Sequence, residues 1–272
     1  MNPSEYAFAD RGHEQRRLAS QAELFGPLTE RVFREAGVGA GMRVLDLGSG
    51  AGDVAMLAAR LVGPEGEVVG IERDPEAVAS ATARVAQAGF SNIRFVQGDV
   101  QALQGIAGGF DAAVGRLVLM YLPDPAAALR RVVELVQPGG LVCIQEGDMA
   151  YDWAAPMTPL WVQIRAWFLT TLERAKASAR MGLSLYATYV AAGLPGPELR
   201  LECALGGGDM AWAWANVMRG VLPLMERLGV TTAAELAAET LADRLQDELR
   251  AAKGVVISPP LIAAWARRPA SS

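Results

Sequence analysis

The chain has 272 residues, of which 51% are apolar, and this length favours one α/β domain with helical additions over two full domains. The formal net charge is -5 and there is no run of Lys or Arg. A nucleic-acid partner is therefore not expected, because nucleic-acid phosphates would need a basic surface. An acidic enzyme that acts on small molecules fits this composition better.

The cysteines and the histidine indicate the cellular compartment and limit the kinds of site that are expected. Cys143 and Cys203 lie in apolar segments without metal-ligand spacing, so we expect buried free thiols in a reducing compartment. Residues 1–5 are polar and no apolar run reaches membrane-spanning length, which predicts a cytoplasmic protein without a membrane partner. His13 is the one histidine of the sequence, so a His-rich metal site is excluded and no metal is expected.

The first half of the chain alternates strands with helices. A helix is expected over residues 14–36, divided in two by Gly26-Pro27. After it, apolar runs and turn residues predict strands at 43–47, 66–71, 92–97, 110–115 and 140–145, and helices at 53–61, 75–88 and 125–136. This alternation with short connections predicts an α/β fold with a doubly wound, mostly parallel sheet. In such sheets the ligand lies over the carboxyl ends of the strands.

The second half of the chain differs in composition and in its expected secondary structure. All six tryptophans lie after residue 150, and we expect helices at 156–179, 181–192, 210–228 and 231–252. A strand is expected at 198–205, and the tail at 255–258 and 261–267 is expected to add one last strand. Gly182 interrupts two helical patterns and is a candidate hinge. These patterns divide the chain into a helical cap (1–37), a Rossmann-like core (38–150) and a remainder (151–272) that completes the sheet and carries a cap of inserted helices.

The strand at 43–47 ends in a turn that contains Gly48, Gly50 and Gly52. Glycines leave the backbone free of side chains where a nucleotide-like ligand approaches. A dinucleotide fingerprint would have its third glycine where this chain has Asp53, and carboxylates at Asp46 and Asp53 would repel a pyrophosphate. S-adenosylmethionine (SAM) has no phosphate and carries an amino group and a sulfonium. The acidic turn therefore predicts a SAM site.

Carboxylates also follow the next two strands. Glu72 lies 22 residues after Gly50, where it can accept hydrogen bonds from both ribose hydroxyls, and a solvated strand end is the alternative. Asp99 ends the third strand and can accept from the adenine amino group while Val100 packs on the ring. A plain turn aspartate is the alternative for Asp99.

These residues together resemble a known family. The stretch 46–52, Glu72, Gly98-Asp99-Val100, the stretch 116–122 and the turn at 138–140 are similar to the ordered motifs of class I SAM-dependent methyltransferases. The resemblance covers about residues 40–147. The flanks at 6–21 and 258–260 are similar to a bacterial branch with a ubiquinone-biosynthesis-type core that often acts on natural products. The resemblance implies a seven-stranded, mostly parallel sheet, SAM as cofactor and S-adenosylhomocysteine (SAH) as product.

The resemblance also implies a role for each position along the strand ends. It assigns the turn of Gly48, Ser49 and Gly50 to the methionine moiety, Glu72 to the ribose, Asp99 with Val100 to the adenine, and Arg116 with Leu117 to a place beside the methionine end and the acceptor. Asp46 and Arg73 are further candidate contacts to the cofactor. The amino-terminal helix would close over the cofactor, with Tyr6, Arg17 and Gln21 as candidate contacts to the carboxylate. An ordinary surface role is the alternative for each of these three.

Methyl transfer from a sulfonium is an in-line displacement on an activated donor, so alignment and exclusion of water supply much of the catalysis. A base is optional. Glu146 or Asp148, which follow the fifth strand, could take a proton from the acceptor, and Tyr121 and His13 are the other candidates. The position of Tyr121 is often histidine in this branch, so a histidine base is excluded there.

Aromatic residues of the second half give the acceptor site its expected character. Trp153, Tyr186, Trp212 and Trp214, together with Tyr121, are candidate substrate contacts, and packing in a core is the alternative. The sequence thus predicts a SAM-dependent methyltransferase of secondary metabolism, acting on C, O or N of a small aromatic or heterocyclic molecule, as a monomer or homodimer. The alternatives are a SAM-binding enzyme of other chemistry such as a cyclase, a methyltransferase of a macromolecule, and a non-catalytic subunit.

Overall fold

The computed structural model describes residues 25–270, and the chain is divided into two units within them. The core unit comprises Phe25–Gly147, Met181–Leu201 and the described part of Leu261–Ser272. The second unit comprises Asp148–Arg180 and Glu202–Pro260. The described chain passes from one unit to the other after Gly147, after Arg180, after Leu201 and after Pro260, so neither unit is a single continuous stretch.

The core unit contains the seven-stranded sheet that the family resemblance implies. Its strands are β1 (Arg43–Leu47), β2 (Glu67–Glu72), β3 (Ile93–Gln97), β4 (Phe110–Arg116), β5 (Val136–Gly147), β7 (Glu198–Glu202) and β10 (Leu261–Arg267), in the spatial order β3-β2-β1-β4-β5-β10-β7. β1 to β5 pair in parallel, and β10 runs antiparallel to β5. The prediction of a doubly wound, mostly parallel sheet is confirmed.

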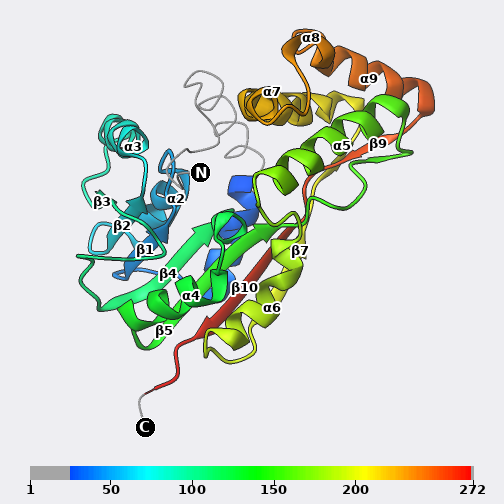
Figure 1. The fold of residues 1–272 in the computed structure, drawn as a ribbon. Helices are drawn as coiled ribbons and strands as arrows, with labels where there is room; N and C mark the ends of the chain where they lie inside the picture. Colours follow the sequence, from blue (N-terminus) through cyan, green and yellow to red (C-terminus); the bar gives the residue numbers. More distant parts are fainter. Residues whose placement is uncertain (1–24, 271–272) are drawn as a thin grey trace. The chain divides into compact units, whose positions relative to one another are not determined.

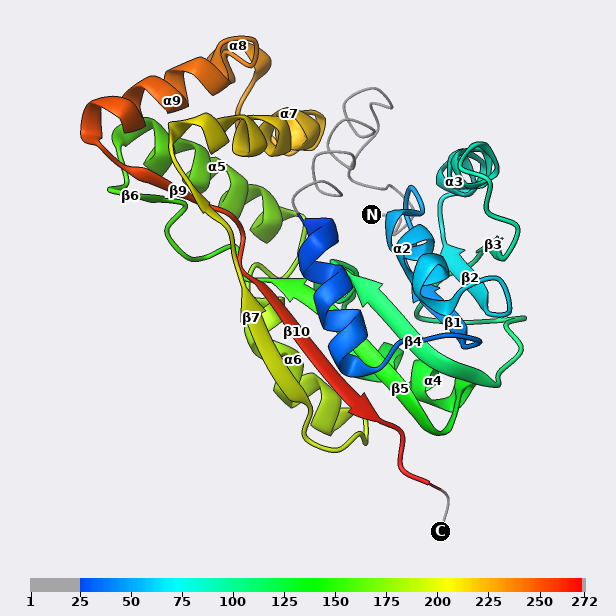
Figure 2. The same ribbon diagram turned by 180° about the vertical axis from the view of Figure 1, so that it is seen from behind.

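Helices cover both faces of this sheet (Figure 1 and Figure 2). The helical residues 25–36 and α2 (Asp53–Val62) lie on one face, where a buried cluster joins Phe33, Ala55 and Cys143. The other face carries α4 (Pro125–Leu135) and α6 (Met181–Ala191), while α3 (Pro75–Gln87) connects β2 to β3. The phenol of Tyr189 on α6 donates to the carbonyl of Ala264 at 2.6 Å. This hydroxyl therefore ties α6 to the sheet.

The starts of the helices follow from their capping residues. The Asp74 side chain accepts the N–H of Glu76 at 2.9 Å, and Pro75 fills the first position of α3, where a missing N–H costs nothing. Asp124 caps α4 in the same way by accepting the N–H of Ala127 at 2.8 Å. The helices expected at 75–88 and 125–136 therefore begin where the sequence predicts.

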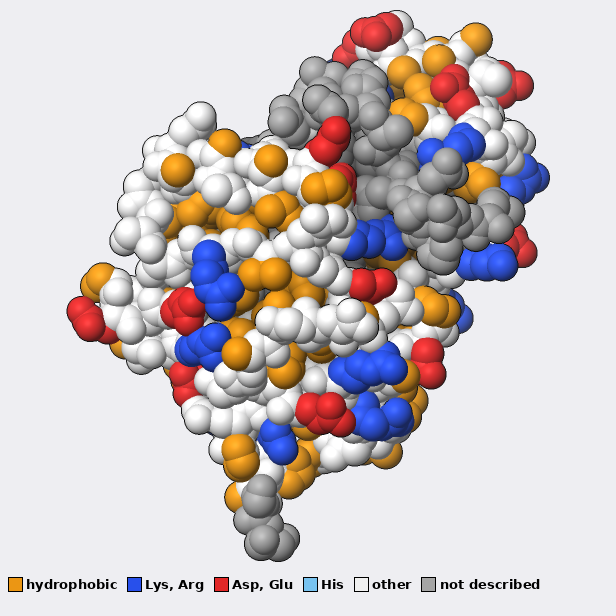
Figure 3. All heavy atoms as spheres, turned by 60° about the vertical axis from the view of Figure 1, so that its left-hand side comes forward, with side chains coloured by type: hydrophobic (Ala, Val, Ile, Leu, Met, Phe, Trp, Pro, Cys, Tyr) orange, Lys and Arg blue, Asp and Glu red, His pale blue; other side chains and the backbone are white. Residues whose placement is uncertain are grey.

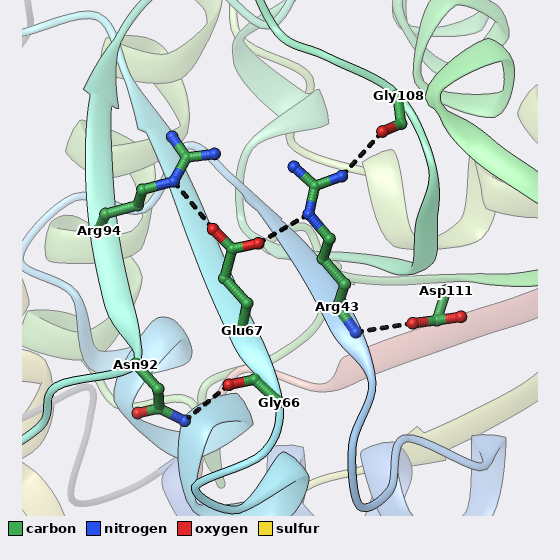
Figure 4. Close-up of polar contacts among 7 residues, drawn as sticks. All are labelled: Arg43, Gly66, Glu67, Asn92, Arg94, Gly108 and Asp111. Atoms are coloured by element: carbon green, nitrogen blue, oxygen red, sulfur yellow. Dashed lines mark hydrogen bonds and ion pairs between the residues drawn. The ribbon is translucent and has the colours of Figure 1, made fainter.

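A network of charged side chains fixes the amino edge of the sheet (Figure 4). The Glu67 carboxylate on β2 accepts from Nε of Arg43 on β1 at 2.7 Å and from Nε of Arg94 on β3 at 2.9 Å. Arg43 also donates to the Gly108 carbonyl at 2.7 Å, and its backbone N–H donates to Asp111 on β4 at 2.7 Å. These bonds link four neighbouring strands at the edge opposite to their carboxyl ends.

The second unit is helical with a small sheet of its own. Its elements are β6 (Ala154–Ala155), α5 (Pro159–Arg174), β8 (Leu205–Gly206), η2 (Gly208–Met210), α7 (Ala211–Arg227), α8 (Ala233–Leu236), α9 (Leu241–Ala252) and β9 (Val255–Ile257). The three strands are antiparallel, in the order β6-β9-β8. Trp153 and Trp214 stack in its core with ring centroids 3.6 Å apart, and Phe168 meets Trp153 edge-on.

Several sequence expectations for the second half are wrong in detail. Residues 231–252 do not form one helix, because Ala237 adopts a left-handed conformation with φ 47° between α8 and α9. The tail forms two strands of different sheets, β9 and β10, in place of one. Gly182 lies where α6 packs closely on the sheet: a Cβ there would lie 2.6 Å from Ile262 Cδ1. Close packing accounts for the glycine at this position, and a hinge there stays a prediction. Cys143 is buried as expected, whereas Cys203 is exposed.

Candidate functional site

The glycine turn after β1 uses its three glycines for different purposes. A Cβ on Gly48 would lie 2.7 Å from Cγ2 of Val118, and a Cβ on Gly52 would lie 2.9 Å from the ring of Phe95. These two glycines therefore make room for neighbouring side chains. A Cβ on Gly50 would meet nothing nearer than 4.0 Å. Of the three, Gly50 is the position where the backbone of the turn faces open space.

Two buried polar atoms of this turn have no hydrogen-bond partner. They are Oδ2 of Asp46, at the end of β1, and Oγ of Ser49. Gln145 Oε1 and Glu146 Oε2, at the end of β5, are also buried and also have no hydrogen-bond partner. Buried polar atoms are normally satisfied, and an orphaned one calls for an explanation such as a bound ligand. The four atoms all lie at the carboxyl ends of β1 and β5, the region where an α/β sheet binds its ligand.

Glu72 is held by the backbone at the end of β2. Its Oε2 accepts the N–H of Gly50 at 3.0 Å, and its Oε1 accepts the N–H of Asp74 at 3.1 Å. The side chain is buried. Each carboxylate oxygen has two lone pairs, so one site on each oxygen remains for another donor. Two hydroxyls on adjacent carbons would suit this arrangement.

Arg116, at the end of β4, places a cation beside these carboxylates. Burial lowers the pKa of Arg116, while Asp53 and Asp46 raise it. For the acid Asp46 the directions are reversed: burial raises its pKa, and the nearby Arg116 lowers it. The guanidinium donates to Oγ1 of Thr29 at 3.0 Å, which fixes it against the helical residues 25–36.

Asp53 differs from the sequence expectation. Its carboxylate forms an ion pair with Arg84 on α3, with Nη2 and Oδ1 2.8 Å apart. A carboxylate already paired with a guanidinium does not offer a free negative charge to a ligand. The acidic character of the turn therefore depends on Asp46 and Glu72, and Asp53 serves to join α2 to α3.

Strand alternation places the charged residues on one face of the sheet. Val68, Val44, Ala112 and Cys143 all belong to the buried cluster under α2 and residues 25–36. Successive side chains of a strand alternate between faces, so residues at even spacing from these share that face. The set on that face at the carboxyl ends of β2, β1, β4 and β5 is Glu72, Asp46, Arg116 and Gln145.

Glu146 lies on the opposite face of β5 and is completely buried. Its Oε1 accepts two backbone N–H groups, from Val118 at 2.9 Å and from Leu119 at 2.6 Å. Burial raises the pKa of Glu146 to about 8, although these backbone N–H bonds lower it. The carboxyl thus holds the turn between β4 and η1 (Leu119–Tyr121). In that turn Leu117 has a positive φ of 57°, an uncommon conformation for a residue other than glycine.

The predicted adenine and ribose residues lie around the ends of β2 and β3. Asp99 accepts the N–H of Gln101 at 2.8 Å, as a turn aspartate does, and Val100 is buried. The Gly98 N–H donates to the Glu72 carbonyl at 2.9 Å, which brings this turn next to Glu72. Arg73 is exposed, beside Glu72. An adenine-binding role for Asp99 and Val100 stays a prediction.

The aromatic candidates separate into core and surface residues. Trp153 and Trp214 are buried against each other, and their indole N–H groups donate to the carbonyls of Met149 and Ile257. Both rings are thus occupied in the packing of the second unit, which is the alternative to substrate contact that the sequence leaves open. Trp212 on α7 is 38% exposed. Tyr186 is exposed on α6, with its hydroxyl over Gly196 and not at the strand ends. Tyr121, in η1, is exposed just beyond β4.

Some predicted residues cannot be placed. Tyr6, His13, Arg17 and Gln21 lie outside the described residues. Asp148, the other carboxylate predicted as a candidate base, is the first residue of the continuous stretch Asp148–Arg180 of the second unit. Its Oδ2 lies 3.9 Å from Nη2 of Arg180. The structure adds Thr29, Val118 and Gln145 to the site. Sequence reasoning missed Thr29 and Val118 because their contacts join residues far apart in the chain. Gln145 stands out only through its buried oxygen without a partner, which the sequence does not show.

The described residues offer no metal cluster and no membrane-spanning helix. Among residues 25–270, no group of three or more His, Cys, Asp or Glu residues is arranged to hold a metal ion. No helix in that range is long and apolar enough to cross a membrane. On the face drawn in Figure 3, basic side chains lie interspersed with acidic and apolar ones, without a continuous basic area.

Known proteins share this sequence pattern and this fold. A family model described as a methyltransferase domain matches residues 39–181, which is more than half of the chain. The uncharacterized protein Rv1405c of Mycobacterium tuberculosis is 31% identical over 44% of this chain and 42% of its own length. An arsenite methyltransferase of Aquipseudomonas alcaligenes is 37% identical over 37% of this chain and 31% of its own length. Aklanonic acid methyltransferase DauC of a Streptomyces species is 32% identical over 44% of this chain and 54% of its own length.

The matched part spans about a third to a half of these curated relatives. Two solved structures share the fold over most of this chain. Phosphoethanolamine N-methyltransferase 2 of Haemonchus contortus, solved with SAH, has a TM-score of 0.57 and 16% identity, covering 89% of this chain and 53% of that one. The [4+2]-cyclase SpnF has a TM-score of 0.54 and 20% identity, covering 90% and 81%. At such low identity these two structures support the fold alone.

Proposed function

Since the chain belongs to the methyltransferase-domain family, we propose that it is a class I SAM-dependent methyltransferase that methylates a small acceptor. The observation that carries this proposal is the set of charged and unsatisfied groups at the carboxyl ends of β2, β1, β4 and β5. Asp46 and Glu72 supply carboxylates, Arg116 supplies a cation, and Asp46 and Ser49 each have a buried atom without a partner.

This set matches the charges of SAM. The methionine end of SAM has an ammonium, a sulfonium and a carboxylate, and the site offers the Asp46 carboxylate and the Arg116 guanidinium as partners for the ammonium and the carboxylate. We assign the ammonium to Asp46 Oδ2, because a buried carboxylate oxygen without a donor is costly until a cation pairs with it. The carboxylate is assigned to Arg116, whose planar guanidinium suits bidentate pairing. Gly50 allows the ligand to approach the backbone of the turn.

The nucleoside end of SAM is assigned to residues at the carboxyl ends of β2 and β3. The free lone pairs on the two Glu72 oxygens are available for the two ribose hydroxyls. The buried Val100, beside the Gly98 turn, gives an apolar contact for adenine, and Asp99 is the candidate acceptor for its amino group. Arg73 is the remaining candidate near the ribose. The cap roles of residues 1–37 and 151–272 also remain part of the proposal.

Bound SAM would supply a methyl group already activated by the positive sulfur. The protein then has to hold the acceptor in line with the sulfur–methyl bond and exclude water, which lowers the barrier without a proton transfer. If the acceptor does lose a proton, the candidate bases are those of the sequence: Glu146, Asp148, Tyr121 and His13. Of these, Tyr121 is the exposed last residue of η1, whose other two residues are buried.

The acceptor class is proposed as a small aromatic or heterocyclic metabolite of the natural-product type. Two of the relatives, an arsenite methyltransferase and an aklanonic acid methyltransferase, are named for small acceptors of very different kinds. A partly exposed Trp212 and an acidic chain without a basic run favour a small aromatic acceptor over a nucleic acid. A cytoplasmic location and a monomeric or homodimeric state stay predictions.

Cyclisation, which the sequence leaves open as an alternative for a SAM-binding enzyme, is the second candidate. The two functions are separated by the fate of the cofactor. The purified protein is incubated with SAM and a panel of phenols, hydroxylated heterocycles and amines, and SAH and product masses are measured. A methyltransferase releases SAH only with an acceptor, in step with a product that has gained one methyl group. A cyclase gives a product of unchanged mass and no SAH. A reaction confined to nucleic acid or protein substrates would show a macromolecular target.

A further inference from the structure

We propose that Glu146 is a positioning residue that holds the turn after β4 in the shape required for cofactor binding, and is not the base of the reaction. The inference rests on the proposed SAM site and assigns a role that the sequence leaves open. It is carried by the bonds that Glu146 makes, by the backbone of the turn, and by the face of β5 on which Glu146 lies.

The first step is the pair of bonds to the backbone. Oε1 of Glu146 accepts the N–H groups of Val118 and Leu119, which lie at the start of η1. The first N–H groups of a helical segment have no partner within it and need an outside acceptor when buried. Glu146 is completely buried, so water does not replace it. One side-chain oxygen therefore satisfies two backbone donors of the turn.

The second step is the conformation that these bonds maintain. Leu117 has a φ of 57°, which costs free energy for a residue with a Cβ and persists only when its surroundings enforce it. On one side, the Leu117 N–H donates to the Gln145 carbonyl at 2.9 Å. On the other side, Glu146 fixes Val118 and Leu119. Adjacent residues of β5 thus hold Leu117 from both sides.

The third step links this turn to the glycine turn. The side chain of Val118 fills the space at Gly48, where a Cβ would lie 2.7 Å from Val118 Cγ2. Arg116, the proposed partner of the SAM carboxylate, directly precedes Leu117. A displacement of Val118 would therefore change both its packing against Gly48 and the position of Arg116. The Glu146 bonds connect the end of β5 to two parts of the proposed cofactor site.

The fourth step concerns the face. Gln145 shares the sheet face of Asp46, Glu72 and Arg116, whereas Glu146 is on the opposite face with Val142 and Ile144. Tyr189 of α6 packs against that face, and its pKa is raised by burial, by Cys143 and by Glu146. The Tyr189 hydroxyl bonds to the backbone of β5 and β10. A carboxyl placed there acts on the site through the backbone.

The test compares SAH affinities by calorimetry for the wild type, Glu146→Gln, Glu146→Met and Glu146→Ala. Glutamine keeps the acceptor oxygen, methionine keeps the volume without it, and alanine removes both. The expected result is an affinity within about threefold of the wild type for Glu146→Gln and at least about tenfold weaker for Glu146→Met and Glu146→Ala, as for the loss of one or two buried hydrogen bonds. Tyr189→Phe is the matched control, because it removes a buried hydroxyl on the same face without touching the turn.

The outcomes separate the inference from the proposed function. A wild type that does not bind SAH overturns the proposed function, and the inference with it. Wild-type affinity in Glu146→Met or Glu146→Ala overturns the inference alone, as would a Glu146→Gln variant as weak as Glu146→Met. Equal weakening by Tyr189→Phe would show that loss of stability lowers the affinity, and would also overturn it. Circular dichroism melting identifies the folded variants, and the methionine variant, which leaves no cavity, serves if alanine does not fold.

Discussion

Arg84 on α3 pairs with Asp53 at the start of α2, with the guanidinium nitrogen 2.8 Å from the carboxylate oxygen. The sequence alone gives Asp46 and Asp53 the same role, as two carboxylates that flank the glycine turn. In the structure only Asp46 keeps a buried oxygen without a partner. The pair of aspartates therefore offers an internal comparison between a carboxylate free to bind a cation and one already neutralised.

Asp46→Asn is expected to weaken SAH binding by about 10- to 100-fold, the range for losing one charge-assisted hydrogen bond. Asp53→Asn is expected to change the affinity less than about threefold while lowering the melting temperature, because it breaks the link between α2 and α3. Calorimetric titration and thermal melting of both variants measure this. Equal losses of affinity in the two variants would contradict the assignment of the ammonium to Asp46.

Gly48 and Gly50 are expected to respond differently to alanine. Both have positive φ, 60° and 50°, so each substitution strains the backbone by about 1–2 kcal/mol. Gly48→Ala also drives a Cβ into Val118 and should be clearly the less stable of the two proteins. Gly50→Ala should fold with the smaller loss but bind SAH poorly, because its methyl group would occupy the space assigned to the ligand. Denaturant unfolding and calorimetry give the two quantities, and a Gly50→Ala variant with wild-type affinity would count against the site.

Glu146 predicts a pH dependence of stability. Its pKa is about 8 in the folded protein and is expected near 4.3 when unfolded. Between these values the folded state binds the extra proton, so its stability falls as pH rises, by up to about 1.4 kcal/mol per pH unit, and levels off above pH 8. Glu146→Gln removes this contribution. The stability of Glu146→Gln relative to the wild type should therefore increase from pH 5 to pH 8, as measured by urea unfolding. A constant difference over that range would show that Glu146 is ionised throughout.

Glu67, at the opposite edge of the sheet, predicts the reverse dependence. Arg43, and then Arg94, lower the pKa of Glu67 through hydrogen bonds. The stabilisation is therefore present above the unfolded pKa of about 4.3 and is lost as pH falls through the lower folded value. Because the side chain is 39% exposed, Glu67→Gln should cost no more than about 1 kcal/mol at pH 7. The cost should disappear in acid, and SAH affinity should be unchanged. A cost that persists below pH 3 would rule out the ion pairs as its source.

The parallel part of the sheet could be predicted because β1 to β4 are short, largely apolar runs bounded by glycine, proline or aspartate. The ends of β1 to β4 are within one residue of the expected ones, and the glycine turn and Glu72 fall where their spacing indicates. Local signals determine these features. The split at Ala237 escaped prediction because no glycine or proline marks it, so the apolar period appeared continuous from 231 to 252.

The parts of the site that escaped prediction depend on contacts between distant residues. Asp53 and Arg84 are 31 residues apart, and Arg116 and Thr29 are 87 apart. Nothing in their local sequence pairs them. Glu146 has the residue type and position of a general base, and only its buried bonds to Val118 and Leu119 indicate another role. Trp153 and Trp214 have the composition of a ligand cage, but they stack on each other.

The central claim is that the strand ends of the core unit bind the adenosyl and methionine parts of SAM. Its most direct measurement is a calorimetric titration of the wild type, Glu72→Gln, Glu72→Ala and the control Glu67→Gln with SAH. We predict one site per chain in the wild type and in Glu67→Gln. Binding should be at least about tenfold weaker in Glu72→Ala, because two hydroxyl contacts are lost, with Glu72→Gln in between. No binding by the wild type, or an unchanged affinity in Glu72→Ala, would contradict the account.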